Sequence, residues 1–221
     1  MPCAEIGREI ANSLDILATN MRNVPDKHRR RRGAFEHSWR LLSEDEQAVF
    51  RKLSGFRGGF TRNGAQQEAG ASLAILVALV DKSLLRVDAN GRYDMHEWRR
   101  QYAREKLNES GEAKAVMDRH RDYLLTFAES AEPELLGANQ LCWHYSLETE
   151  LGNLRAAIAW SQESGGIEAS LRLMGSLYYL WSLHGYYRES YEQLMAILSL
   201  PAARVRTIAR AKALNAVGTI Q

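Results

Sequence analysis

The sequence predicts a mainly α-helical protein, in which a winged helix with one β-hairpin is followed by an α-solenoid of helical hairpins. Three observations support this fold class. Apolar residues recur at helical spacing along nearly the whole chain. One extended apolar segment, residues 83–87, is followed by a turn at 88–91 and a returning strand at 92–95. Beyond residue 111 only helices are expected, joined by short connections that imply antiparallel neighbours.

The N-terminal region contains a helix and a basic run. The helix is indicated by one apolar stripe: Ile6, Ile10, Leu14 and Leu17. It should end before Val24-Pro25, because a residue that precedes proline is disfavoured in the α conformation. The basic run is expected to be a connector. It contains five positively charged residues of a chain whose net charge is +2: Lys27, Arg29, Arg30, Arg31 and Arg32. A solvated linker and a patch that binds phosphate, DNA or an acidic protein surface both remain open.

Local signals place the helices of the winged helix. Ser43 and Glu46 form a capping box at the start of one helix, where each side chain can bond the backbone of the other. Thr61 precedes a second short helix, and Ser72 is an N-cap for a third. A further helix is expected from about residue 96 to 107, after the hairpin. Helices, then a hairpin, then another helix is the order of a winged helix.

The solenoid is expected to contain helices at residues 112–131, 146–163, 167–184, 187–199 and 203–219. Alanine- and glycine-containing segments at 169–177 and 209–220 are separated by about 40 residues, near the period of two-helix repeats. The last helix reaches Gln221 without a cap. We therefore expect the array to continue in a longer protein and this chain to be truncated.

The sequence contains no arrangement of residues typical of catalysis. It has no phosphate-binding loop, no cysteine and histidine set at metal-ligand spacing and no nucleophile elbow. We expect neither enzymatic activity nor a bound cofactor or metal in this chain. Cys3 and Cys142 stand in unrelated contexts, as is typical of thiols in a reducing cytoplasm. No apolar run reaches the ~18–20 residues of a membrane span, so a cytoplasmic location is expected.

Two further features are candidates for binding. His96 begins a helix, where free backbone N–H groups and the helix dipole favour an anion or a phosphate. A capping or packing role is the alternative. Among the aromatic residues, Trp160 and Trp181 are expected in the core. Tyr186 and Tyr187, in a loop, are candidates for protein binding.

Five segments together resemble the bacterial signal-transduction ATPases of the STAND class, which are NB-ARC-like regulators with tetratricopeptide-type (TPR) sensor repeats. The segments are FEHSWRLLS (35–43), FRGGF (56–60), LVDKSLL (79–85), YDMHEWR (93–99) and ELGNLRAA (150–157), and they occur in the family's order. The resemblance implies a TPR-like solenoid and a P-loop domain upstream of this chain. It also implies three domains: residues 1–32 as the tail of a small helical domain with a basic linker, 33–108 as the winged helix and 109–221 as the first repeats.

The resemblance also implies a role for His96. In the family, the histidine of a Met-His-Asp element contacts the β-phosphate of bound ADP and holds the inactive state. Here the element is Met95-His96-Glu97, with glutamate in place of aspartate. ADP or ATP with Mg²⁺ is therefore expected only in the intact parent protein. One hydrogen bond to phosphate contributes about 1.5–3 kcal/mol, whereas millimolar affinity needs about 4 kcal/mol, so the chain alone should not bind ADP measurably.

Two functions are compatible with these features. We expect a regulatory, protein-interaction fragment of a nucleotide-switched signalling or transcription-regulatory ATPase, whose winged helix senses the nucleotide state and whose repeats bind a protein or effector. The alternative is a DNA-binding transcriptional regulator, with the helix at 72–82 in the major groove and the basic run on phosphates. Residues 72–80 offer almost no side chain that could read a base edge, so nucleic acid is the less expected partner. No membrane partner is expected.

Overall fold

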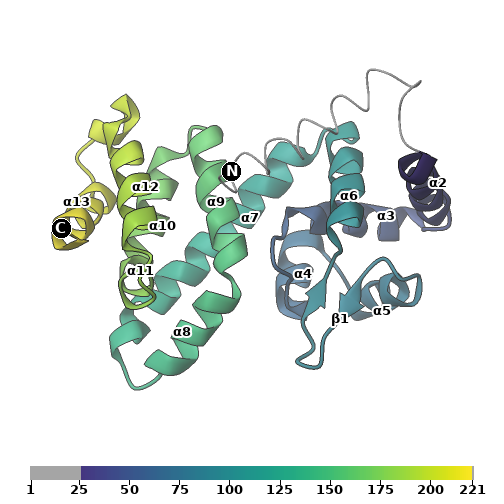
Figure 1. Cartoon of the computed structure of the whole chain (residues 1–221), viewed down its shortest axis with the longest axis horizontal. Coiled ribbons are helices and arrows are strands. Elements are labelled where there is room, and N and C mark those ends of the chain that lie inside the picture. The colour runs from purple at the N-terminus through teal and green to yellow at the C-terminus, as the bar shows by residue number, and fades with distance from the viewer. Residues whose placement is uncertain (1–25, 221) are drawn as a thin grey trace. The chain divides into compact units, whose positions relative to one another are not determined.

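The computed structural model of the 221-residue chain describes residues 26–220, with the side chains of 26–31, 34 and 220 left aside (Figure 1). The chain divides into two compact units, Met1–Glu44 and Asp45–Gln221, and each is described by itself. The described part is mainly α-helical with one two-stranded sheet, which confirms the fold class. None of the described helices is long and apolar enough to cross a membrane.

Helix α2 (Asp26–Arg40) is the described element of the first unit, and it contains the basic run. The run that the sequence predicts to be a connector is therefore helical. Lysine and arginine are good helix formers, and the helix dipole favours Arg40 in the last turn. The domain boundary expected between residues 32 and 33 falls inside this helix. The helix proposed for residues 6–17 lies outside the described residues.

The winged-helix part, as we call it, runs from α3 to α6 and consists of α3 (Glu44–Lys52), η1 (Leu53–Gly55), α4 (Arg62–Ala69), α5 (Leu73–Asp81), β1 (Arg86–Val87), β2 (Tyr93–Asp94) and α6 (Glu97–Glu109). Helix α3 begins directly after Ser43, as the capping box predicts. The Thr61 hydroxyl accepts a hydrogen bond from Gly64 N at 3.0 Å. The Ser72 hydroxyl accepts one from Ile75 N at 3.3 Å. The predicted N-cap at Ser72 is confirmed, and Thr61, which the sequence predicts only to precede a helix, is an N-cap as well.

The hairpin forms where the sequence predicts it, but its strands are shorter than expected. Strand β1 pairs with β2 in antiparallel register, with Val87 opposite Tyr93. Residues 83–85 close the C-terminal end of α5 instead of extending the strand: Ser83 has a positive φ, and the N–H groups of Leu84 and Leu85 both donate to Leu79 O. On its other side, Tyr93 exchanges two backbone hydrogen bonds with Phe60, at 2.8 and 2.9 Å. This bridge attaches the segment before α4 to the wing.

The repeat part follows and consists of α7 (Ala113–Ala131), η2 (Glu132–Leu136), α8 (Gln140–Thr149), α9 (Leu151–Glu163), α10 (Ile167–Ser176), α11 (Tyr178–Leu183), α12 (Tyr187–Ser199), η3 (Pro201–Arg204) and α13 (Ile208–Ile220). Helix α10 packs against α7, α9, α12 and α13, so its apolar face joins the whole array (Figure 1). One core runs through these helices and includes Leu124, Leu147, Leu154, Leu171 and Trp181.

Two of the expected solenoid helices are in fact pairs. The segment 146–163 is divided at Glu150 between α8 and α9, and the segment 167–184 is divided at Leu177 between α10 and α11. Neither break has a proline or glycine at its centre, so the local sequence carries no stop signal. The break at Glu150 is the one that shapes the candidate site, because Glu150 and Asn153 at the break contact Arg92 and Gly59 of the winged-helix part.

Candidate functional site

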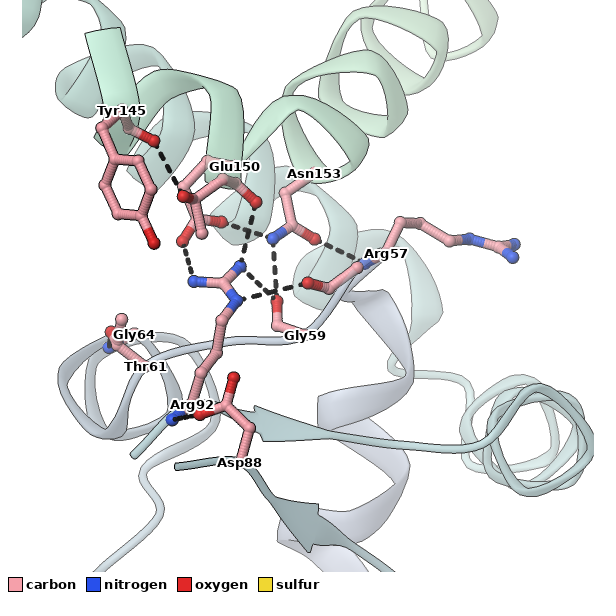
Figure 2. A network of polar contacts seen from close by, with 11 residues as sticks. Arg57, Gly59, Thr61, Gly64, Asp88, Arg92, Tyr145, Glu150 and Asn153 are labelled. Atoms are coloured by element: carbon pink, nitrogen blue, oxygen red, sulfur yellow. Dashed lines mark hydrogen bonds and ion pairs between the residues drawn. The ribbon is translucent and has the colours of Figure 1, made fainter. Parts of the chain in front are cut away.

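The candidate site is the place where the winged-helix part meets the repeat part, which we call the joint. Its residues come from the loop after η1, the residue before β2 and the break between α8 and α9: Arg57, Gly58, Gly59, Arg92, Glu150, Gly152 and Asn153. Figure 2 shows Arg92 extending from the wing toward Glu150 and Asn153. Two of the segments that carry the family resemblance, 56–60 and 150–157, therefore lie against each other.

Two glycines allow this close approach. Gly59 has a φ of +84°, and a Cβ built there would lie 2.7 Å from Tyr93 O. A Cβ on Gly152 would lie 2.5 Å from Arg57 O. Real Cβ atoms do not come so near a backbone oxygen. A larger residue at Gly59 would therefore push the loop after η1 away from β2, and one at Gly152 would push the repeat part away from the winged-helix part.

Arg92 is the hub of the joint. Its Nη1 donates to Glu150 Oε1 at 2.6 Å, and its Nη2 donates to Gly59 O at 3.0 Å. The same guanidinium also donates to Gly58 O and Thr149 O. The side chains of Arg92 and Glu150 are each only 14% exposed, so water screens this ion pair little. Loss of one partner from such a pair typically costs about 3–5 kcal/mol, because the other charge is left buried.

Asn153 completes the network from the first turn of α9 and is fully buried. Its Nδ2 donates to Gly59 O at 2.9 Å and to Glu150 Oε2, and its Oδ1 accepts from the N–H of Arg57. The carboxylate of an aspartate could not donate to Gly59 or Glu150, and a leucine could make none of these bonds. Only an amide can donate to Gly59 O and Glu150 while accepting from the N–H of Arg57.

A second polar link connects the two parts on helices α4 and α7. Glu68 and His120 are both buried, with Glu68 Oε2 and His120 Nδ1 2.5 Å apart. Burial raises the pKa of Glu68 above its ordinary value, although the hydrogen bond with His120 acts in the opposite direction. Arg119 Nη1 also donates to Glu68 O at 3.0 Å. Beside this pair lies a cleft of about 520 Å³ between α4, α7 and α8, lined in part by Asn63, Gln67, Tyr123, Phe127 and Trp143.

His96 is the N-cap of α6, and its side chain is exposed. Its Nδ1 accepts from Trp98 N at 3.4 Å, which confirms the capping role that the sequence left open. With Nδ1 as acceptor, the proton of the neutral imidazole is on Nε2. The contact of His96 with a nucleotide phosphate stays a prediction. His96 is not part of the joint, but only Tyr93, Asp94 and Met95 separate it from Arg92.

The other predicted site residues lie apart from the joint. Tyr186 packs edge-on against Trp181, with ring centroids 5.8 Å apart, and borders a cleft of about 590 Å³. Tyr187 is 49% exposed. Trp181 is in the core as expected, whereas Trp160 is half-buried and donates to Asp118 at 3.0 Å. Binding of a protein by Tyr186 and Tyr187 stays a prediction.

The basic run can be described only in part. In the described side chains, Arg32 is exposed on α2, while the side chains of Lys27, Arg29, Arg30 and Arg31 lie outside the described residues. Within the described part of the chain no group of acidic, histidine or cysteine side chains could hold a metal ion.

Sequence reasoning missed Arg92, Glu150 and Asn153 as a site. The pair of glycines at 58 and 59 and the Gly152-Asn153 dipeptide were available signals, since each marks a place where backbones approach closely. Their partners are more than 30 residues away in the sequence, so a single sequence could not show which segments meet.

No family model matches this chain. Over 93% of its length it is 38% identical to a Mycobacterium tuberculosis protein provisionally named an HTH-type transcriptional regulator, and to a Mycobacterium bovis protein of the same provisional name. The chain spans 25% of the length of these relatives. An uncharacterised Mycobacterium bovis protein is 43% identical over 38% of this chain and 24% of its own length.

Among solved structures, the chain is similar to a STAND protein with a TPR sensor from Pyrococcus horikoshii. The TM-score is 0.43 at 16% sequence identity, and the similarity covers 84% of this chain and 30% of that one.

Proposed function

We propose that this chain is the relay of a nucleotide-switched transcription-regulatory ATPase, without enzymatic activity of its own. The winged-helix part follows the nucleotide state of the intact protein, and the repeat part binds a protein partner or effector. The observation that carries the proposal is the joint, where Arg92, Glu150 and Asn153 lock the two parts together. The names of the mycobacterial relatives support a regulatory role.

The joint suits a relay because its contacts have one good geometry. Buried charges and amides are costly unless every bond is made, so the network favours one arrangement of the two parts over nearby alternatives. A displacement of the wing is then passed on to α9 and to the helices that pack on it. Coupling between the nucleotide site and the partner-binding site requires a structural element whose state both sites influence. A rigid joint provides such an element.

His96 is well placed for the input side of the relay. Its Nε2–H is an exposed hydrogen-bond donor, which suits a phosphate oxygen. A displacement of His96 would reach Arg92 through β2, because two of the connecting residues, Tyr93 and Asp94, are paired with β1 and Tyr93 is also paired with Phe60. The nucleotide, with Mg²⁺, belongs to the intact parent protein in this proposal.

A chimaera tests the proposal. The aligned region of the Mycobacterium tuberculosis relative is replaced by this chain, and ADP release and reporter transcription are measured. We expect Arg92→Ala to uncouple transcription from the nucleotide state. Arg62→Ala, which removes an exposed arginine on α4, is the matched control and should respond as the unmodified chimaera does. A normal response of the Arg92→Ala chimaera would exclude the joint as the relay.

A second candidate is direct DNA binding, which the helix-turn-helix in the relatives' name favours. Helix α5 would be the recognition helix, but its outward side chains include Leu73 and Val77, which are 44% and 47% exposed and cannot read a base edge. Lys82, at its end, is paired with Glu46 at 2.7 Å. Filter binding of this chain to duplex DNA separates the candidates: submicromolar, strongly salt-dependent binding would favour DNA recognition.

A further inference from the structure

Three arginines gather beside the joint with too few negative partners. Arg57 is on the loop after η1, and Arg100 and Arg104 are one turn apart on α6. Among the described residues, Glu97 is the one carboxylate in contact with them. Its Oε1 is 3.5 Å from Arg57 Nη1, and its Oε2 pairs with Arg100.

The remaining hydrogen-bond donors of this cluster have weak partners. Arg100 Nη1 donates to Phe56 O at 3.4 Å, and Arg100 Nε is buried without a partner among the described residues. Arg104 Nη1 contacts the sulfur of Met117 at 2.7 Å. A thioether is a neutral and weak acceptor, so it does not offset the charge of Arg104.

The arginines also destabilise one another. Burial lowers the pKa of Arg57, Arg100 and Arg104, and the charge of Arg57 lowers the pKa of the other two further. Asp94 and Glu163 act in the opposite direction, Asp94 on Arg100 and Glu163 on Arg104. Asp94 is already paired with Arg86. Because guanidinium groups stay charged at neutral pH, the cluster holds positive charge that its contacts do not offset.

We propose that Arg57, Arg100 and Arg104 form a binding site for a phosphate dianion, as inorganic phosphate or as the phosphate of a phosphomonoester. Three guanidinium groups and the Glu97 carboxylate leave two positive charges, which match the ≈ −1.5 to −2 charge of such a phosphate at neutral pH. The planar guanidinium fork matches the geometry of phosphate oxygens. The Arg57 side chain is 53% exposed, so the site opens to solvent.

The site is attached to the joint through Arg57. The backbone N–H of Arg57 donates to Asn153 Oδ1, while its side chain belongs to the cluster. A bound phosphate would draw the Arg57 side chain toward α6 and hold the loop in the position that Asn153 requires. Phosphate binding would therefore stabilise the joint. This consequence deepens the proposed relay function, whereas the binding itself does not depend on that function.

Thermal unfolding and isothermal titration of the whole chain test the site. Sodium phosphate and phenyl phosphate are compared with sodium chloride at matched ionic strength. We expect saturable binding of both phosphates and a rise in Tm that chloride does not give. Arg57→Gln and Arg104→Gln should each weaken phosphate binding roughly tenfold, which is the loss expected for one charge-assisted hydrogen bond. The Arg57 side chain is half-exposed, so its replacement should leave the fold intact. Arg99→Gln removes the same charge from the same helix outside the cluster and should leave the affinity unchanged.

Each outcome decides for or against the site. Equal weakening by Arg57→Gln and Arg99→Gln would show a general charge effect and overturn the proposal. An equal Tm rise in chloride would do the same. Binding of inorganic phosphate without phenyl phosphate would restrict the ligand to the free ion. Displacement of phosphate by duplex DNA, with a steep salt dependence, would reassign the cluster to a nucleic-acid backbone. If the chimaera still couples transcription to the nucleotide state but the chain binds no phosphate, the phosphate site is refuted and the proposed relay function is not.

Discussion

Replacement of Asn153 by alanine removes the amide that joins Arg57, Gly59 and Glu150. Gly59 O keeps its hydrogen bond from Arg92, but the N–H of Arg57 and Glu150 Oε2 each lose a partner in a partly buried place. A buried polar group left unpaired costs about 1–3 kcal/mol, so the two together should lower the free energy of unfolding by roughly 2–6 kcal/mol. That is a large share of the stability of a domain of this size.

Asn153→Asp gives the same site a pH dependence. The introduced carboxyl lies beside Glu150 and has no donor for Gly59 O, so burial and like charge should raise its pKa in the folded state. A carboxyl whose folded-state pKa is raised favours folding at low pH and opposes it as the pH rises. The unfolding free energy of this variant should therefore fall, relative to that of the native chain, as the pH rises above about 4, the ordinary pKa of an aspartate.

Urea unfolding followed by circular dichroism measures both variants. Asn139→Ala is the matched control, because Asn139 is exposed and its side chain makes no cap hydrogen bond; its effect should stay within about 0.5 kcal/mol. If Asn153→Ala were as mild as this control, the reasoning about the joint would be refuted.

Three further substitutions test the surrounding structure. Gly152→Ala places a Cβ 2.5 Å from Arg57 O and should destabilise the chain by about 1–3 kcal/mol in a thermal melt. Gly218→Ala, which has open space around it in a helix, is the control and should be neutral or stabilising. Equal effects of the two substitutions would contradict the close approach at Gly152. Because burial raises the pKa of Glu68 above its ordinary 4.5, the native chain should lose stability relative to Glu68→Gln as the pH rises above that value. Urea titrations at several pH values check this, and a constant difference would refute it. Trp181→Ala, in the repeat core, should cost about 3–5 kcal/mol in the same urea assay, and a loss below about 1 kcal/mol would contradict its placement.

Local signals in the sequence were sufficient for most helices of the winged-helix part. Thr61 and Ser72 cap α4 and α5 because a hydroxyl before a helix has one obvious use, to accept from a free N–H of the first turn. The helices themselves follow from the apolar stripes. The helix at the basic run was not predicted because a cluster of like charges suggests a linker, although lysine and arginine each favour a helix.

The joint could not be predicted in the same way. Asn153 and Gly59 are 94 residues apart, and neither carries a local signal for the other. Glu150 interrupts a continuous apolar stripe without a proline or glycine, so periodicity alone predicts one helix where two exist. The contacts that set this break are tertiary: Glu150 is held by Arg92 from the wing. Sequence patterns thus placed the helices, whereas the connection between the two parts required the three-dimensional structure.

The central claim is that the joint fixes the winged-helix part to the repeat part. Double electron–electron resonance measures this directly, with spin labels at exposed Ala74 on α5 and Met195 on α12, in a chain whose native cysteines are replaced by serine. We predict one narrow distance distribution for the native joint and a broad one for Arg92→Ala. A broad distribution with the native joint would contradict the account.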